Sequence, residues 1–237
     1  MNNIINQIPL LNVPSAAWEH KFEKVIKDKY IAKKYNRKNR IISKINYINN
    51  FVSEIKFGNG YILDIGPGPG EFLELCRYYN NKIIGIDAKL EESEMGNEYM
   101  KISQLMTERQ KIPVLYSGFE NYLENKLPFD DKELSIINSQ GSIEQVFKKN
   151  LFGPSHLETK KASLLSWKLD QDLMDKFELL FSEANRVLKK DGLFVIYANG
   201  SKNTEEYHKC ILNICKKTNF SIEKNHSFNF HKMRKND

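Results

Sequence analysis

Apolar positions follow two alternating periods along most of the chain. Short apolar runs predict strands at Tyr61–Ile65, Lys82–Asp87, Ile112–Tyr116, Leu134–Asn138 and Leu193–Ala198. Segments with helical spacing separate these runs and predict helices at Pro69–Tyr79, 97–110, Gln171–Lys190 and 203–218. Two last apolar runs predict a closing strand pair at Phe220–Lys224 and Phe228–Lys232. Strands that alternate with helices predict an α/β protein whose parallel sheet is covered on both faces.

Two parts of the chain lie outside this alternation. Residues 1–57 show helical spacing from about 16 to 37 and again from about 40 to 57, so we expect a helical cap before a larger domain at 58–237. Residues 146–170 interrupt the alternation after the fourth strand and form an insertion that can cover a ligand site. The pair Asp191–Gly192 predicts a turn that ends the preceding helix.

The length and charge of the chain refine this division. Its 237 residues suffice for one large domain with a small appendage. The formal net charge is +6, but residues 1–57 alone carry +7 and the remainder carries −1. A basic segment attracts anions such as nucleic acid, an anionic surface or a phosphorylated small molecule. The alternative is a solvated helix face in a Lys-, Asn- and Ile-rich chain.

Several classes of protein are excluded by what the sequence lacks. No apolar run approaches the roughly 18–20 residues of a membrane-spanning helix. The first ten residues have neither the basic flank nor the apolar stretch of a signal peptide. Cys76, Cys210 and Cys215 are too few and too unevenly spaced for a disulfide framework or a zinc site. We therefore expect a cytoplasmic protein without a membrane span.

A glycine loop follows the first predicted strand. The strand carries Asp64 near its end, and the loop contains Gly66, Gly68 and Gly70. Glycines permit positive φ and let a ligand approach the backbone, and the helix that follows presents free N–H groups. The second strand ends in Asp87, whose carboxylate can accept hydrogen bonds from both hydroxyls of a ribose. Alternatively, Asp64 only braces the loop and Asp87 only caps a helix.

The loop does not match two common nucleotide-binding patterns. The dinucleotide fingerprint requires a glycine three residues after its second one, where this chain has Glu71. A Walker loop ends in Gly-Lys followed by Ser or Thr, and this loop does not. The glycines with Asp87 therefore indicate a ribose-containing ligand of another kind.

These residues resemble the class I S-adenosylmethionine (SAM)-dependent methyltransferases, over roughly residues 58–237. That family has an acid followed by Gly-x-Gly-x-Gly after its first strand, and Asp64 with the three glycines matches it without a gap. The resemblance implies a Rossmann-like, doubly wound, mostly parallel seven-stranded sheet with an antiparallel last strand. It also implies SAM as cofactor, with S-adenosylhomocysteine as product. Asp64, the glycines and the ribose-binding Asp87 then surround its methionine and ribose.

The resemblance extends to the ends of the third and fourth strands. Family members hold adenine after strand three, often with an acid. This chain has Gly118 and Phe119 at that place, so we favour stacking of adenine on Phe119. The alternative is that Phe119 is an ordinary core aromatic. The segment that begins with Asn138 and Ser139 matches the family's cofactor-binding segment after strand four. No metal is predicted, because metal-assisted methyltransferases of the catechol type place acids after strand four, where this chain has Asn138.

The candidates for catalysis lie near the expected methyl position and in the insertion. The family often has Glu-His after strand four, and this chain has Glu144 and Gln145, so a histidine base is absent there. Glu144 can orient SAM or the acceptor. His156 in the insertion is the preferred candidate base, followed by His20. For His208, His226 and His231, surface or structural roles are favoured.

An aromatic and basic cluster on the first helix is the candidate clamp for an anionic acceptor. Its members are Tyr30, Lys33, Lys34, Tyr35 and Arg37. The compact domain and the insertion favour a small-molecule acceptor, through oxygen rather than nitrogen, such as a phosphorylated or carboxylated precursor of a bacterial surface polysaccharide. The alternatives are a small-molecule N-methyltransferase, an RNA methyltransferase that docks through the basic segment, and a SAM-binding protein without catalysis. The amino-methylating nucleic-acid motif is missing after strand four, so nucleic acid is disfavoured; the sequence indicates no oligomeric state.

Overall fold

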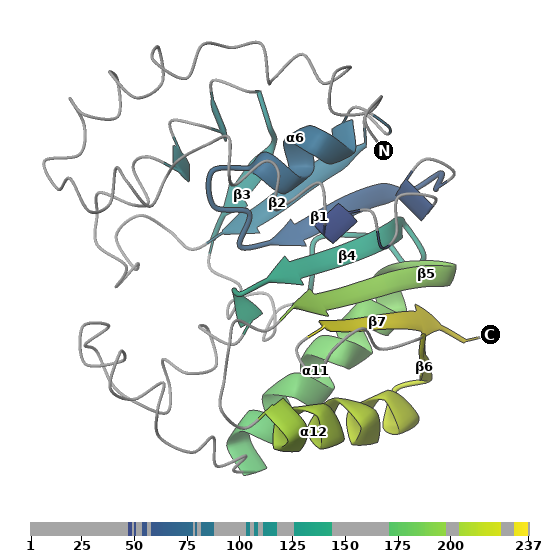
Figure 1. The fold of residues 1–237 in the computed structure, drawn as a ribbon. Helices are drawn as coiled ribbons and strands as arrows, with labels where there is room; N and C mark the ends of the chain where they lie inside the picture. The colour runs from purple at the N-terminus through teal and green to yellow at the C-terminus, as the bar shows by residue number, and fades with distance from the viewer. Residues whose placement is uncertain are drawn as a thin grey trace, which may run out of the picture.

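Seven strands form one mixed sheet (Figure 1). The computed structural model describes residues 47–48, 50, 54–55, 58–77, 79, 82–87, 103–104, 107–108, 111–117, 126–143, 171–197, 204–223 and 230–236. The strands are β1 (Tyr61–Ile65), β2 (Ile83–Asp87), β3 (Val114–Tyr116), β4 (Leu134–Gln140), β5 (Leu188–Tyr197), β6 (Phe220–Ile222) and β7 (Phe230–Lys235). Their order across the sheet is β3-β2-β1-β4-β5-β7-β6.

The strand directions confirm the predicted fold class. Strands β3, β2, β1, β4 and β5 pair in parallel, whereas β7 runs antiparallel to both β5 and β6. The sheet is therefore Rossmann-like and mostly parallel, with an antiparallel last strand. The order reverses between β1 and β4, and open α/β sheets bind ligands at the carboxyl ends of the strands beside such a reversal. Figure 1 shows these carboxyl ends at the left of the molecule.

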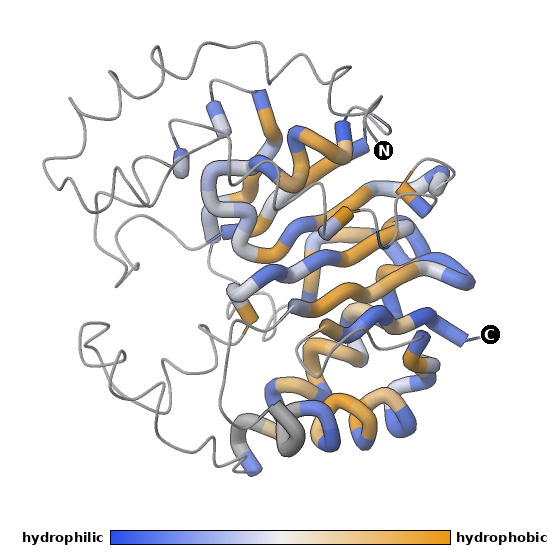
Figure 2. Tube along the Cα trace, in the orientation of Figure 1, coloured by the Kyte–Doolittle hydropathy of each residue, from blue (hydrophilic) through white to orange (hydrophobic). Residues whose placement is uncertain are grey.

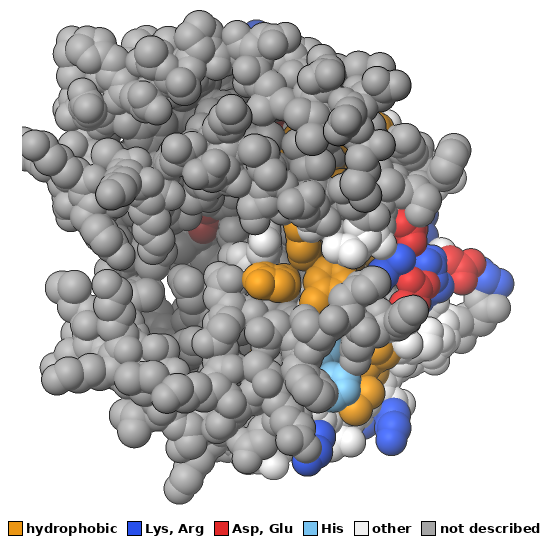
Figure 3. All heavy atoms as spheres, viewed as in Figure 1, with side chains coloured by type: hydrophobic (Ala, Val, Ile, Leu, Met, Phe, Trp, Pro, Cys, Tyr) orange, Lys and Arg blue, Asp and Glu red, His pale blue; other side chains and the backbone are white. Residues whose placement is uncertain are grey.

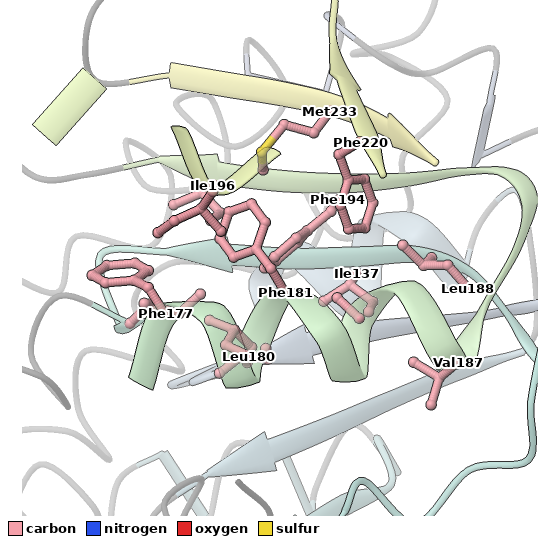
Figure 4. Packing of buried hydrophobic residues seen from close by; sticks show 14 of the residues in the cluster. Ile137, Phe177, Leu180, Phe181, Val187, Leu188, Phe194, Ile196, Phe220 and Met233 are labelled. Carbon is pink, nitrogen blue, oxygen red and sulfur yellow. The ribbon is translucent and has the colours of Figure 1, made fainter. Parts of the chain in front are cut away.

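Helices α11 (Gln171–Val187) and α12 (Thr204–Lys217) cover one face of the sheet. Strand side chains alternate between the two faces, and those on this face pack on Phe177, Leu180 and Phe181 of α11 (Figure 4). The ring centroids of Phe181 and Phe194 lie 5.0 Å apart, and those of Phe181 and Phe220 lie 5.8 Å apart. This cluster is the larger of the two hydrophobic cores among the described residues.

Helix α6 (Glu71–Arg77) covers the other face, together with Tyr47, Ile48 and Ile55 from the N-terminal part. Figure 2 shows apolar stretches along the middle of the strands and polar stretches toward their ends. None of the described helices is long and apolar enough to span a membrane.

The predicted boundary between α11 and β5 is wrong. The helix was expected to reach Lys190, but it ends at Val187, and β5 starts directly at Leu188. The predicted turn at Asp191–Gly192 lies inside β5 as an irregularity, with φ of 59° at Asp191. Pairing with β4 jumps there, from Leu134 opposite Leu188 to Ile136 opposite Leu193. The turn signal was therefore real, but it marks a bulge in the strand rather than the end of a helix.

Partly buried ion pairs join the N-terminal part to the C-terminal strands. Lys232 Nζ lies 2.6 Å from Glu54 Oε1 and 2.8 Å from Glu223 Oε2, and Arg234 pairs with both acids. Figure 3 shows basic and acidic side chains in contact at the right of the molecule. Burial opposes the charge on Lys232, but the hydrogen bonds to Glu223 and Glu54 outweigh it and raise the pKa of Lys232. Of the predicted cap at 1–57, the described residues 47–48 and 54–55 are helical; its division from 58–237 stays a prediction.

A histidine pair joins α12 to β7 and makes stability depend on pH. His208 Nδ1 lies 3.0 Å from Nε2 of the fully buried His231. Burial lowers the pKa of His231 to about 4 from an ordinary 6.5, and the nearby His208 lowers it further. The unfolded chain therefore takes up this proton near pH 6.5, whereas the folded protein takes it up only near pH 4.

We expect the free energy of unfolding to be highest above pH 6.5 and to fall by about 3 kcal/mol as the pH drops to 4, through this histidine alone. Urea denaturation at several pH values measures the effect. The variant His231→Gln cannot titrate there, so its unfolding free energy should change less over the same range. Parallel pH profiles for the two proteins would contradict this assignment.

Candidate cofactor site

The predicted glycine loop connects β1 to α6 at the carboxyl edge of the sheet. Its glycines all have positive φ, with 69° at Gly66, 53° at Gly68 and 83° at Gly70. L side chains rarely adopt such backbone angles, which is why the loop needs glycine at these positions. The Gly66 N–H donates to the carbonyl of Ile86 at 2.8 Å, and the Gly70 N–H donates to that of Pro67 at 3.0 Å. These hydrogen bonds therefore fix the loop conformation and connect the end of β1 to the tip of β2.

Gly66 also has no room for a side chain. A Cβ there would lie 2.2 Å from Ser142 Oγ and 2.4 Å from Ser142 Cβ. The Ser142 hydroxyl donates to the carbonyl of Gly66 at 3.1 Å, so the segment after β4 holds the loop from the other side. The loop thus depends on contacts from both neighbours of β1.

Asp64 lies in a chain of buried hydrogen bonds that crosses the reversal point of the sheet. The side chain of Asp64 is 3% exposed, and Asn138, directly opposite it on β4, is fully buried. Asn138 Nδ2 donates to Asp64 Oδ1 at 2.7 Å, and the Tyr47 hydroxyl donates to Asn138 Oδ1 at 2.6 Å. Buried polar groups need such partners. Asp64 therefore braces the site, and its side chain is fixed between β1 and β4.

Ser139 is also fully buried. Its hydroxyl accepts a hydrogen bond from the Ile143 N–H at 3.3 Å, so it shapes the turn that follows β4. Cofactor contact by Asn138 and Ser139 stays a prediction.

Asp87 lies half-buried at the tip of β2, as predicted, beside the end of β3. It is paired in register with Tyr116 of β3. The Tyr116 hydroxyl lies 2.8 Å from Thr107 Oγ1. Burial raises the pKa of Tyr116, and the negative charge of Asp87 raises it further, against the hydrogen bond from Thr107. A neutral phenol and a carboxylate therefore lie together where the sequence predicts the ribose and adenine.

Tyr47 is the residue that sequence reasoning missed. The predicted helix at 40–57 was defined by its isoleucines and valine, and Tyr47 has no distinguishing motif. Its hydroxyl meets a residue 91 positions later in the chain. Only the folded structure brings Tyr47 and Asn138 together.

Most other predicted site residues lie outside the part of the chain that the structure describes. These are the catalytic candidates Glu144, Gln145, His156 and His20, the adenine-site residues Gly118 and Phe119, and the clamp residues Tyr30, Lys33, Lys34, Tyr35 and Arg37. Of the histidines, the buried His231 has the structural place expected of it, whereas His208, expected at the surface, is half-buried against it.

Solved structures with a similar fold include methyltransferases. One from Archaeoglobus fulgidus has a TM-score of 0.50 at 19% identity and covers 83% of this chain and 76% of its own. A methyltransferase from Pyrococcus furiosus has a TM-score of 0.48 at 14% identity and covers 83% of each chain. The sequence matches no family model and no curated protein. The chain therefore has the class I SAM-dependent methyltransferase fold, and the fold that the sequence resemblance implied is confirmed.

Proposed function

We propose that this protein binds SAM and transfers its methyl group to a small anionic acceptor. One observation carries the proposal: a glycine loop with three positive-φ glycines joins the buried Asp64 to α6, with Asp87 at the neighbouring strand tip. This arrangement lies at the carboxyl edge beside the reversal of strand order, the usual ligand position in open α/β sheets.

Charge favours SAM over a nucleotide phosphate at this loop. From Asp64 through Glu74 the chain carries Asp64, Glu71 and Glu74 and no basic residue, and all three acids are buried. A pyrophosphate beside these acids would be repelled, and the loop has no lysine to offset that repulsion. SAM instead carries a positive sulfonium and a positive ammonium group. The acids around the loop are thus complementary to this cofactor.

The chain's own residues would hold the cofactor and the acceptor in reacting geometry. The Asp87 carboxylate would accept hydrogen bonds from the ribose hydroxyls, and Asp64, fixed by Asn138, would brace the methionine end of the site. When bound, SAM supplies an electrophilic methyl group on a sulfonium. Transfer forms a bond from this carbon to the acceptor and breaks the carbon–sulfur bond, which leaves S-adenosylhomocysteine. The protein contributes alignment and the exclusion of water.

An acceptor hydroxyl must lose its proton during the transfer. His156 is the proposed base, with Glu144 and Gln145 orienting the reactants. The anionic acceptor follows from the charge distribution, because residues 1–57 carry +7 beside a nearly neutral remainder. Tyr30, Lys33, Lys34, Tyr35 and Arg37 would clamp its phosphate or carboxylate, and 146–170 would cover it. A cytoplasmic sugar or metabolite, such as a surface-polysaccharide precursor, has this chemistry.

RNA is the second candidate acceptor, favoured by the same +7 segment. Incubation with methyl-labelled SAM and the separated small-molecule and RNA fractions of a cell extract tests both. We expect label in the anionic small molecules and none in RNA, and strongly reduced transfer by Asp87→Ala. Label in RNA, at a level that falls steeply with salt, would reverse the choice of acceptor.

Charge reversal tests the proposed clamp. Lys33→Glu with Lys34→Glu should raise the KM for the acceptor about tenfold or more, because two attractive charges become repulsive. The KM for SAM should stay within about twofold, since its site lies on the sheet. Lys216→Glu with Lys217→Glu, at the exposed end of α12, is the matched control. Equal effects on both KM values would exclude the clamp.

A further inference from the structure

The Tyr47 hydroxyl connects the N-terminal part of the chain to the cofactor loop. We propose that Tyr47 is a positioning residue of this site: it acts through Asn138 on Asp64 and thereby sets the glycine loop. The link to SAM rests on the proposed function, whereas the link to the loop does not. Tyr47 lies outside the glycine motif, and its partner Asn138 lies 91 positions later in the chain.

The direction of the hydrogen-bond chain is determined by its carboxylate end. The amide NH₂ group of Asn138 donates to Asp64 Oδ1 at 2.7 Å. The other amide atom is then the carbonyl oxygen, and the Tyr47 hydroxyl 2.6 Å away must donate to it. Each bond in such a buried chain polarises the next. The phenol therefore satisfies the carbonyl oxygen of Asn138 in the amide orientation that serves Asp64.

The ring of Tyr47 is itself held rigidly. It makes edge contacts with Phe72 of α6, Tyr197 of β5 and Phe230 of β7, with ring centroids 6.2, 6.0 and 5.7 Å away. Aromatic pairs prefer this edge-to-face geometry. The phenol oxygen is thus positioned by three elements of the fold and leaves little freedom to the amide that it contacts.

The neighbouring residues anchor the same segment along the sheet face. Ile48 and Ile55 are buried, and Glu54 binds Lys232 of β7. The described residues of this segment, 47–48 and 54–55, therefore pack on one face of the sheet, where Tyr47 contacts Asn138 and Glu54 contacts Lys232. Docking of this segment and the geometry of the loop are coupled, and the coupling must act in both directions.

Exchange of the glycine amides tests the loop directly, without any ligand. The chain has 12 glycines, so selective ¹⁵N-glycine labelling gives a simple spectrum. In Tyr47→Phe, which keeps the ring and loses the hydroxyl, we expect the Gly66 and Gly70 amides to exchange about three to ten times faster relative to Gly85. Ile48→Val removes one methyl group next to Tyr47 and should leave this ratio unchanged. No change in Tyr47→Phe, or equal acceleration at all three glycines, would overturn the proposal.

Cofactor affinity gives the second test. By calorimetry, Tyr47→Phe should bind S-adenosylhomocysteine about three to ten times more weakly, and Ile48→Val should bind it like the unmodified protein. An unchanged Kd in Tyr47→Phe, or an equal loss in both variants, would refute the role at the cofactor site. If the unmodified protein does not bind S-adenosylhomocysteine, the proposed function fails, and the exchange measurement still decides whether Tyr47 sets the loop.

Discussion

Changing Asp87 to alanine is expected to weaken SAM binding about 100-fold. A carboxylate that accepts two ribose hydroxyls makes two charge-assisted hydrogen bonds, each contributing about 1.5 kcal/mol or more. The half-buried position of Asp87 at the tip of β2 strengthens such bonds relative to water. In the unmodified protein, SAM well above its Kd should raise the melting temperature by mass action. Thermal denaturation with and without SAM should show this rise nearly lost in Asp87→Ala.

A matched variant separates this effect from a general loss of charge. Asp175 is exposed on α11, where it accepts a hydrogen bond from Gln171 at 2.7 Å. Asp175→Ala should keep the full SAM-dependent rise. A full rise in Asp87→Ala would favour the alternative that Asp87 only caps a helix.

Gly66→Ala is expected to have the largest effect on stability. Its φ of 69° is strained for any L residue, and the new Cβ would lie 2.2 Å from Ser142 Oγ. Strain of this kind and overpacking each cost about 1–3 kcal/mol, so the free energy of unfolding should fall by about 3 kcal/mol. Urea denaturation measures the loss, and SAM binding should be lost with the loop.

A second substitution separates the cost of the φ strain from the cost of the overlap with Ser142. Ser142→Gly in the Gly66→Ala background removes the side chain that the new Cβ meets, so roughly half of the stability should return, while the φ strain remains. A loss below about 1 kcal/mol in Gly66→Ala would show that the loop relaxes easily and is not the rigid support described above.

The local sequence predicted the α/β class, the glycine loop and the place of Asp87 at a strand tip. Strand β1 was predicted with its observed bounds, because Tyr61–Ile65 is apolar and glycines follow it closely. The glycine loop and Asp87 were also found from the sequence, since each depends on residue type at a strand end. These features need only local backbone chemistry and the tendency of parallel strands to end at one edge.

Strand ends that depend on contacts between residues far apart in the sequence were predicted less well. Strand β7 was expected to end at Lys232, but it continues to Lys235, because Glu54 and Glu223 neutralise the charges of Lys232 and Arg234. Strand β4 extends past the predicted end because its polar residue Asn138 is buried with partners.

The contacts that complete the site depend on packing as well. The hydrogen bonds of Tyr47 and the histidine pair join residues that meet only once the sheet has formed. Their burial and pairing are results of tertiary structure, and no local pattern indicates them.

Calorimetric titration of the unmodified protein with S-adenosylhomocysteine tests directly whether the protein has a SAM-binding site. We expect saturable binding of one molecule per chain, with no comparable binding of NAD or ATP, because the glycine loop is flanked by acids and has no basic residue from Asp64 through Glu74. An absence of binding by S-adenosylhomocysteine, or preferential binding of a dinucleotide, would contradict it.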